Sequence, residues 1–525
     1  MSTQHGTLQR GLDSTRSHLS QGRFGRMFRA LPAAGFGADE RTNMANLHVL
    51  AEAMKAPAGD VPKDGTDDEE SGIPALYTYF GQFLDHDITF DPVSSLTQMN
   101  DPDGLVDFRT PAFDLDGLYG RGPDDQPYMY DKRDKTKAGQ FLLGDPLTGT
   151  SDAQAQDLLR NGAQERAIIG DPRNDENAIV SQLHGLLQRA HNRLMEKHKD
   201  FEVARQQLRF HYQYVIVHDF LERIIKAPVL EHLKADDDFG IKRFSKSKLK
   251  FFKWDNLPFM PTEFSVAVYR LGHSMVRPGY RLNDGVAPIP TFAGPTHASL
   301  GGFRKMTPDR AIDWGRFVDT DLREYGDDSG STPVNKKRLQ LAYRLDTSLV
   351  NPLAHLKAAG VVSDDPPSLA ERNLLRGWRF GLPSGQDVAR YMGVTPLTDT
   401  QIKIGKHGGT GSDTPKPIST LGVAAFEGNC PLWTYILAEA MHNATDIAPP
   451  VLVGGVAGVR KISTPQMGEV GGRIVAEVFL GLLFGDNSSY LTLHPKFVPK
   501  IGGVETTDFK LRDLVNFALG KIDLW

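Results

Sequence analysis

Apolar positions recur with helical spacing in three long passages of the chain. Residues 201–230 keep this spacing as far as Pro228, and residues 264–283 give a further helical segment that ends near Pro278. Residues 176–200 predict one long helix, whose apolar stripe follows steps of three and four: Ile179, Leu183, Leu186, Leu187, Ala190 and Leu194. Alternation typical of strands is sparse. The pattern therefore predicts a mainly α protein.

Composition supports a large buried core in a single unit. The chain has 525 residues, of which 40% are hydrophobic, and length alone would suggest about three domains. No break in composition supports three. Three stretches are polar or rich in Gly and Pro, residues 1–22, 60–70 and 403–419, and they predict a terminal tail and two surface loops. We therefore expect a polar tail over residues 1–22 and one domain over residues 23–525.

Charge and cysteine content exclude several classes of function. The net charge is −5 and no basic stripe occurs, so nucleic acid is not expected as a partner. The most apolar late segment, 474–485, is short and contains Glu477, which predicts no membrane span. The start lacks an apolar leader region, so we expect a cytoplasmic protein or export by an unconventional route. Cys430 is the single cysteine, so a metal must be bound through His, carboxylate or carbonyl groups.

Residues 77–87, YTYFGQFLDHD, form the most informative stretch. A helix here would be mostly buried, and Gln82, Asp85, His86 and Asp87 would then need polar partners. Taken alone, the motif is more often a core histidine beside two surface aspartates. The other motifs of the chain change that balance.

A second motif, TPAFDLDGLYG at 110–120, carries oxygen ligands at alternate positions. Thr110, Asp114 and Asp116 suit a hard cation such as calcium, which takes six to eight oxygen atoms. The loop needs at least one carboxylate from elsewhere, and Asp87 is the obvious candidate. An Asp-x-Asp pair by itself is usually a solvated turn.

Three further motifs place polar groups at helical spacing. Arg173 and Glu176 lie in GDPRNDE, where they could simply be a charge pair at a helix start. In VYRLGHSMVRP, a histidine follows an arginine on an apolar segment, and a core histidine is again the common explanation. The last motif, RNLLRGWRFGLP at 372–383, contains Asn373 and Arg376.

Together and in this order, the five motifs resemble the animal-type haem peroxidases of the peroxidase–cyclooxygenase superfamily. The resemblance runs from about residue 70 to 490, and the segments PLWTYILAEA and GEVGGRIVAEVFLGLLFGDNSSYL look like those of bacterial members. It implies a large, mainly α single-domain fold with few short strands and with haem between central helices.

The resemblance also implies roles for individual residues. His273 matches the proximal ligand of the haem iron, with Asn373 accepting its other ring N–H. His86 matches the distal histidine that takes a proton from hydrogen peroxide and returns it to the departing oxygen. Arg173 matches the distal arginine that stabilises charge as the O–O bond breaks, and Gln82 matches the glutamine above the iron.

The remaining matches concern the cofactors, which would be a haem b derivative and one calcium ion. Arg270 and Arg376 match the haem-propionate contacts, and Asp85 and Glu176 match the two carboxylates that form ester bonds to haem. The calcium ligands of the family match five positions: Asp87, Thr110, Ala112 through its carbonyl, Asp114 and Asp116.

Two departures from the family pattern shape the expected activity. Asn177 stands where myeloperoxidase-like enzymes have a methionine bonded to haem, and Arg270 stands where the oxygenases have a radical-forming tyrosine, although Tyr269 is adjacent. The resemblance thus implies a peroxidase that reduces hydrogen peroxide and, through compound I, oxidises small donors such as bromide, iodide, thiocyanate and phenols, with weak chloride oxidation. The alternatives are a fatty-acid dioxygenase of the same superfamily and a peroxinectin-like adhesive or structural module.

Overall fold

The computed structural model of the chain describes residues 22–57, 67–90, 99–100, 106–107, 109–237, 240–292, 299–326, 337–356 and 366–525. One hydrophobic cluster extends from Phe24 near the start to Leu524 near the end, and a small second cluster surrounds Tyr325. The expected polar tail and most of the loop at 60–70 lie outside the described residues. The loop at 403–419 forms a hairpin of mostly half-buried and exposed residues.

Helices carry the architecture, which confirms the mainly α prediction. Their bounds are α1 Glu40–Ala53, α2 Leu76–Ile88, α3 Asp116–Tyr119, α4 Ala178–His198, α5 Phe201–Val215, α6 Leu221–Ile224, α7 Ala227–Glu231, α9 Leu369–Arg379, α10 Gly385–Met392, α11 Leu432–His442, α12 Gly471–Gly485, α13 Tyr490–Leu493 and α14 Leu511–Ala518. Among the described residues, no helix is both long and apolar enough to cross a bilayer.

Strands are short and mostly form isolated pairs. In the described part of the chain, one sheet has three strands, in the order β3 (Val106–Asp107), β1 (Gly22–Gly25) and β8 (Met260–Pro261), with β1 antiparallel to β3 and parallel to β8. The two-stranded pairs are β2 Glu70–Pro74 with β11 Leu341–Tyr343, β4 Leu143–Pro146 with β5 Gln156–Leu158, β6 Lys234–Asp236 with β7 Lys242–Phe244, β9 Gly279–Tyr280 with β10 Ile289–Pro290, β12 Lys403–Ile404 with β13 Lys416–Pro417, β14 Thr445–Ile447 with β17 Ile462–Thr464, β15 Leu452–Val453 with β16 Val456–Ala457, and β18 Lys500–Ile501 with β19 Val504–Glu505.

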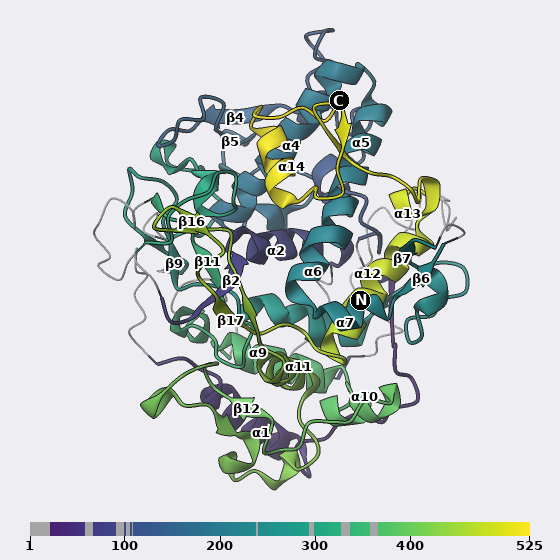
Figure 1. Cartoon of the computed structure of the whole chain (residues 1–525), viewed down its shortest axis with the longest axis vertical. Coiled ribbons are helices and arrows are strands. Elements are labelled where there is room, and N and C mark those ends of the chain that lie inside the picture. Colours follow the sequence, from purple (N-terminus) through teal and green to yellow (C-terminus); the bar gives the residue numbers. More distant parts are fainter. Residues whose placement is uncertain are drawn as a thin grey trace.

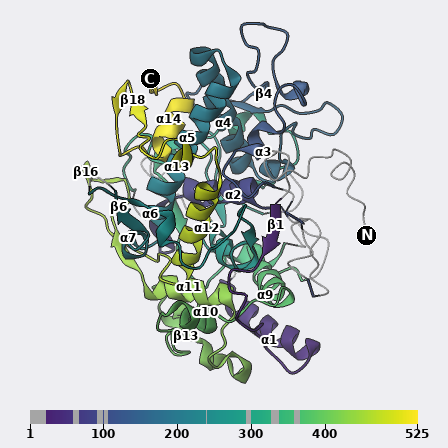
Figure 2. The ribbon, with the colours of Figure 1, turned by 90° about the vertical axis from the view of Figure 1, so that its right-hand side faces the viewer.

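Helix α2 lies near the middle of the molecule. Figures 1 and 2 both place α4, α5 and α14 above it, and α9, α10 and α11 below it. Helix α4 and the segment 268–273 both pack directly on α2. The motifs at 77–87, 172–176 and 268–273 therefore meet around one central helix.

The long helix predicted from residues 176–200 is observed as α4. It begins after Asn177, whose side chain accepts the backbone N–H groups of Ile179 and Val180 and so caps the helix. The next passage was predicted to stay helical to Pro228, but the chain is extended at Ile225. Pro228 instead lies in the first turn of α7, where a missing N–H costs nothing.

The helix predicted to begin at residue 264 and to end near Pro278 is wrong in type and in length. Residues 263–267 form a π-helical turn, residues 268–273 are wound as a 3₁₀ helix, and helical structure ends well before Pro278. At Ala267 the backbone leaves helical geometry, with φ −126° and ψ −69°. The segment is buried on nearly every side, so its apolar pattern cannot reveal the change of winding.

Candidate active site

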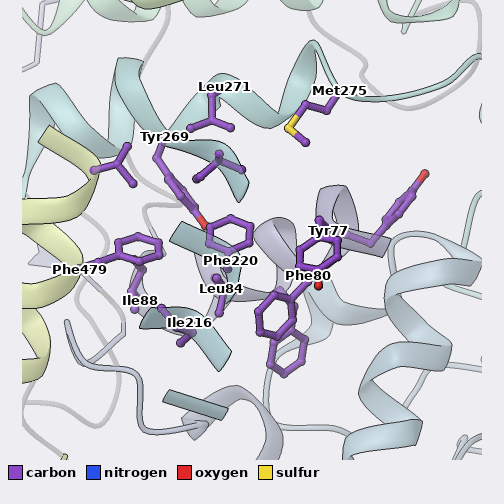
Figure 3. Close-up of a cluster of buried hydrophobic side chains, with 14 of the residues drawn as sticks. Tyr77, Phe80, Leu84, Ile88, Ile216, Phe220, Tyr269, Leu271, Met275 and Phe479 are labelled. Carbon is purple, nitrogen blue, oxygen red and sulfur yellow. The ribbon is translucent and has the colours of Figure 1, made fainter. Parts of the chain in front are cut away.

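Helix α2 presents two faces that differ in chemistry. Its apolar face, one residue per turn, consists of Tyr77, Phe80, Leu84 and Ile88. Figure 3 shows this face in a cluster with Ile216 and Phe220 from the segment after α5, with Phe479 of α12, and with Tyr269, Leu271 and Met275. The opposite face carries Gln82, Asp85 and His86. Burial of the apolar face therefore fixes the direction in which the polar groups point.

His86 is held as a neutral imidazole. Its Nδ1–H donates to Oδ1 of Asn174 at 2.8 Å, and Nε2 lies 3.9 Å from a carboxylate oxygen of Glu176. Burial, and secondly the positive charge of Arg173, lower the pKa of His86 to about 3. With Nδ1 protonated, the lone pair is on Nε2, so the ring can accept a proton at that atom.

Arg173 is immobilised beside His86. Its Nη2 donates to the backbone carbonyl of His86 at 2.8 Å and to Asp171 at 2.7 Å, and its guanidinium lies 4.4 Å from the ring centroid of Phe90. Asp171 is fully buried; burial alone would raise its pKa, but the hydrogen bonds and charge of Arg173 lower it to about 2. The site thus contains a fixed positive charge next to a neutral base.

Glu176 is a partly exposed carboxylate next to His86. Burial raises the pKa of this carboxyl to about 7, partly offset by Arg173, while 37% of its side chain stays accessible. Gln82 donates to Glu176 through Nε2 and accepts at Oε1 from Asn177 at 3.1 Å. Burial also raises the pKa of Asp85, partly offset by Arg173 and then by Arg270.

His273 and Asn373 form a second histidine–asparagine pair, comparable to His86 and Asn174. The amide nitrogen of Asn373 lies 2.8 Å from Nδ1 of His273. The two ends of an amide have the same shape, so a half-turn places Oδ1 at this point, where it accepts Nδ1–H and leaves the lone pair of Nε2 for a metal. Burial, and secondly the charge of Arg270, lower the pKa of His273 to about 3, which keeps the ring neutral.

Two arginines lie on the elements that carry this pair. Arg376 is one turn after Asn373 in α9. Arg270 lies in the 3₁₀ segment, its carbonyl accepts from Nε1 of Trp433 at 3.3 Å, and its charge acts on both Asp85 and His273. Gly272 directly precedes His273, and no neighbouring atom lies within 4 Å of the position that a Cβ atom would take there. Neutral nitrogen donors, nearby arginines and open space beside His273 fit a haem with two propionates.

The carboxylates of Asp87, Asp114 and Asp116 converge on one point. One oxygen from each lies within 4.8 Å of the others, and Oδ1 of both Asp87 and Asp116 is buried without a hydrogen-bond partner in the described part of the chain. Burial, and secondly repulsion from the two other carboxylates, raise the pKa of Asp87 well above its usual value. Such a cluster fits a hard cation, which would remove this repulsion. Thr110 and Ala112 lie on the same loop, where Leu115 takes a left-handed conformation with φ 61°.

Three polar residues of the site had no predicted role. Asn174 holds His86, Asp171 holds Arg173, and Arg109 bridges Asp171 to Asp116. Asn174 and Asp171 lie inside the GDPRNDE motif, so a search for partners of His86 and Arg173 among their sequence neighbours could have found them. For Arg109 the sequence signal is its position directly before the loop at 110–120, which carries the candidate calcium ligands.

Comparison with known proteins supports the same assignment. Residues 101–304 match the family "Animal haem peroxidase". No curated protein sequence gives a significant match. Among solved structures, peroxidase A from Dictyostelium discoideum is similar with a TM-score of 0.55 and 15% identity, covering 91% of this chain and 89% of that one. The fatty acid alpha-dioxygenase of Oryza sativa is similar with a TM-score of 0.51 and 15% identity, covering 93% of this chain and 79% of that one.

Residues 101–304 therefore resemble the animal haem peroxidases, and the chain shares the fold of solved members of the peroxidase–cyclooxygenase superfamily. The animal haem peroxidase family binds haem. The match covers Arg173, Glu176 and His273, whereas His86 and Asn373 lie outside the matched residues.

Proposed function

We propose that this chain is a haem-dependent peroxidase that reduces hydrogen peroxide and oxidises small electron donors. The observation that carries the proposal is the pairing of a neutral base with a fixed cation: His86 held through Nδ1 by Asn174, next to Arg173 held by Asp171. Heterolysis of a peroxide needs both, because one oxygen must lose a proton while the other leaves with negative charge.

His273 would hold the haem iron, with Asn373 orienting its ring, and Arg270 and Arg376 would contact the propionates. Bound haem would supply the iron that binds peroxide and stores two oxidising equivalents. Gln82, held by Asn177 and Glu176, would orient water or a small anion in the distal pocket.

In this scheme His86 moves one proton. Nε2 would accept a proton from one oxygen of hydrogen peroxide and return it to the other oxygen, which would leave as water. The ring stays neutral before each cycle because burial and Arg173 keep its pKa at about 3. Arg173 stabilises the negative charge on the departing oxygen, and Asp171 keeps the guanidinium in place.

We further propose ester bonds from Asp85 and Glu176 to haem and a calcium ion held by Asp87, Asp114 and Asp116 with Thr110 and Ala112. Burial raises the pKa of both ester candidates, to about 7 for Glu176, so the Glu176 carboxyl is partly protonated near neutral pH. Asp87 follows His86 in α2, so a bound cation would anchor the helix that carries the distal base.

Bromide, iodide, thiocyanate and phenols are the donors we propose, with weak oxidation of chloride. Asn177 offers no sulfur for a bond to haem, and its side chain is occupied in capping α4 and holding Gln82. Robust chlorination at neutral pH by the purified protein would refute this part of the proposal.

Oxygenation of a fatty acid is the second candidate, because the fold is shared with the rice alpha-dioxygenase. Tyr269 is the one tyrosine of the segment 268–273, and its hydroxyl donates to the carbonyl of Gly81 in α2 at 3.1 Å. The ring of Tyr269 belongs to the apolar cluster of Figure 3. It is also stacked on the ring of Phe264. Oxygen uptake with a fatty acid in the absence of peroxide would favour this candidate.

The first test is an absorption spectrum of the haem-loaded protein before and after addition of hydrogen peroxide. A Soret band that shifts with peroxide, and that does so far more slowly in His86→Leu, supports the peroxidase. Acid–butanone extraction then tests the esters, because haem that stays with the polypeptide is covalently bound. A protein that binds no haem would overturn the proposal and favour a structural role.

A further inference from the structure

A continuous chain of ion pairs joins the carboxylate cluster to the distal arginine. Arg109 contacts Asp116 through Nη1 at 3.2 Å and Asp171 through Nη2 at 2.8 Å. Asp171 in turn binds Arg173, whose Nη2 also donates to the carbonyl of His86. Four charged side chains therefore connect the proposed cation site with the backbone of His86.

The central carboxylate is shared between two guanidinium groups. Oδ2 of Asp171 lies 2.8 Å from Nη2 of Arg109 and 2.7 Å from Nη2 of Arg173. Asp171 is fully buried, so water cannot take over either contact. Both guanidinium groups also lie over the ring of Phe90, at 6.0 Å and 4.4 Å from its centroid. A stronger pull on the carboxylate by Arg109 must weaken its hold on Arg173.

We propose that Arg109 and Asp171 are positioning residues that couple cation binding at the Asp87, Asp114 and Asp116 cluster to anion binding beside Arg173. The inference rests on the proposed function, because it takes the cluster as a calcium site and Arg173 as the contact for an anion at the iron.

The sign of the coupling follows from electrostatics. Without a cation, Asp116 attracts Arg109, and Asp171 is left to neutralise Arg173. A bound cation neutralises Asp116 and repels Arg109 toward Asp171. Asp171 then divides its charge between two arginines, and Arg173 has more positive charge to offer an anion in the pocket. Cation binding should therefore raise the affinity of the pocket for anions, and the reverse must hold equally.

The first test compares calcium affinities of the full-length protein as purified and treated with EGTA, by titration calorimetry. Arg109→Gln removes a cation that competes for Asp116, so it should bind calcium more tightly, by about fivefold, the low end of measured couplings between sites. Asp171→Asn keeps the shape but leaves Asp116 as the remaining carboxylate for Arg109, so its calcium affinity should fall. The control is Arg121→Gln, since Arg121 pairs with Asp125 at the surface.

Opposite shifts in the two variants distinguish coupling from damage, because a purely structural defect would weaken calcium binding in both. Calcium affinities that fall in both variants, that stay at the parent value, or that are undetectable in the parent would overturn the proposal.

The second test measures cyanide affinity of the haem-loaded protein with calcium and with EGTA. Calcium should tighten cyanide binding in the parent and in Arg121→Gln, and have little effect in Arg109→Gln. An equal calcium effect in Arg109→Gln would show that coupling runs through another path, such as α2, and would refute the role of Arg109. A parent protein that binds no haem would refute the proposed function instead, while the opposite shifts in calcium affinity would still decide the coupling.

Discussion

Replacement of Asn174 by leucine is the sharpest test of the distal pocket. The side chain is 1% exposed, its Oδ1 accepts Nδ1–H of His86, and its Nδ2 donates to His184 at 3.2 Å. Leucine has nearly the same volume but accepts no hydrogen bond. The proton of His86 would then have no partner at Nδ1 and would move to Nε2, the atom that must accept the proton of peroxide.

The expected loss can be estimated from that hydrogen bond. Leaving a buried donor unpaired costs about 1–3 kcal/mol. This cost would set the preference between the two tautomers of His86. The population of the tautomer protonated at Nδ1 would then fall by roughly 5- to 150-fold, since 1.4 kcal/mol is a factor of ten.

The assay is stopped-flow measurement of the rate at which peroxide changes the Soret band. Asn192→Leu is the matched control, because Asn192 also uses both ends of its amide, accepting from Phe141 N at 2.7 Å and donating to Phe141 O at 3.0 Å. It should lose stability but keep the rate. Asn174→Asp adds a charge that favours the protonated ring, so its rate should begin to fall at a higher pH than in the parent.

An unchanged rate in Asn174→Leu with normal haem content would refute the claim that the hydrogen bond from Nδ1 to Asn174 keeps Nε2 free to accept a proton. A loss of rate in Asn192→Leu as large as in Asn174→Leu would point to general destabilisation instead.

Three further outcomes are expected. Chelation of calcium should lower the melting temperature, because a ligand at about 100 times its Kd contributes about 2.7 kcal/mol to the folded state; an unchanged melting curve argues against a bound cation. Asp85→Asn combined with Glu176→Gln should make haem extractable by acid–butanone, whereas each single variant should keep one link; full retention in the double variant would refute the esters. Burial lowers the pKa of His211 to about 4, so between pH 6.5 and 4 the unfolded chain takes up the proton first and the parent loses stability. From pH 7 to pH 5, urea unfolding should show His211→Phe gaining about 2 kcal/mol relative to the parent, and no change with pH would contradict the shift.

The helices with a one-sided apolar stripe were predictable from sequence. Helix α4 was expected from its stripe and α2 from its motif, because each has one face in the core and one face with polar contacts. The winding of the segment 263–273 was not predictable, since a segment that is buried on nearly all sides shows apolar residues at every spacing. Its winding is set by neighbours distant in sequence, such as the backbone of Met27 and Phe28, whose N–H groups donate to Glu263.

The polar site was predictable only in part, for a related reason. Motifs indicated His86, Arg173, His273 and Asn373 through resemblance, and the structure places each histidine beside an asparagine. The resemblance assigned no role to the partners Asn174 and Asp171, although both lie inside the GDPRNDE motif. Asp171 acquires its importance from Arg109, a residue on a different loop, and no local pattern encodes that contact.

Asn177 shows how a departure from a family pattern can be read once its contacts are known. From the sequence alone, Asn177 is notable only because it lacks the methionine sulfur that could bond to haem. In the structure its Oδ1 accepts two N–H groups at the start of α4, a contribution of about 0.5–2 kcal/mol for a capping residue. Its Nδ2 also fixes Gln82. A methionine could neither cap α4 nor donate a hydrogen bond to Gln82. Asn177 therefore stabilises the start of α4 and orients Gln82, and a methionine that bonds to haem from this position would lose both contacts.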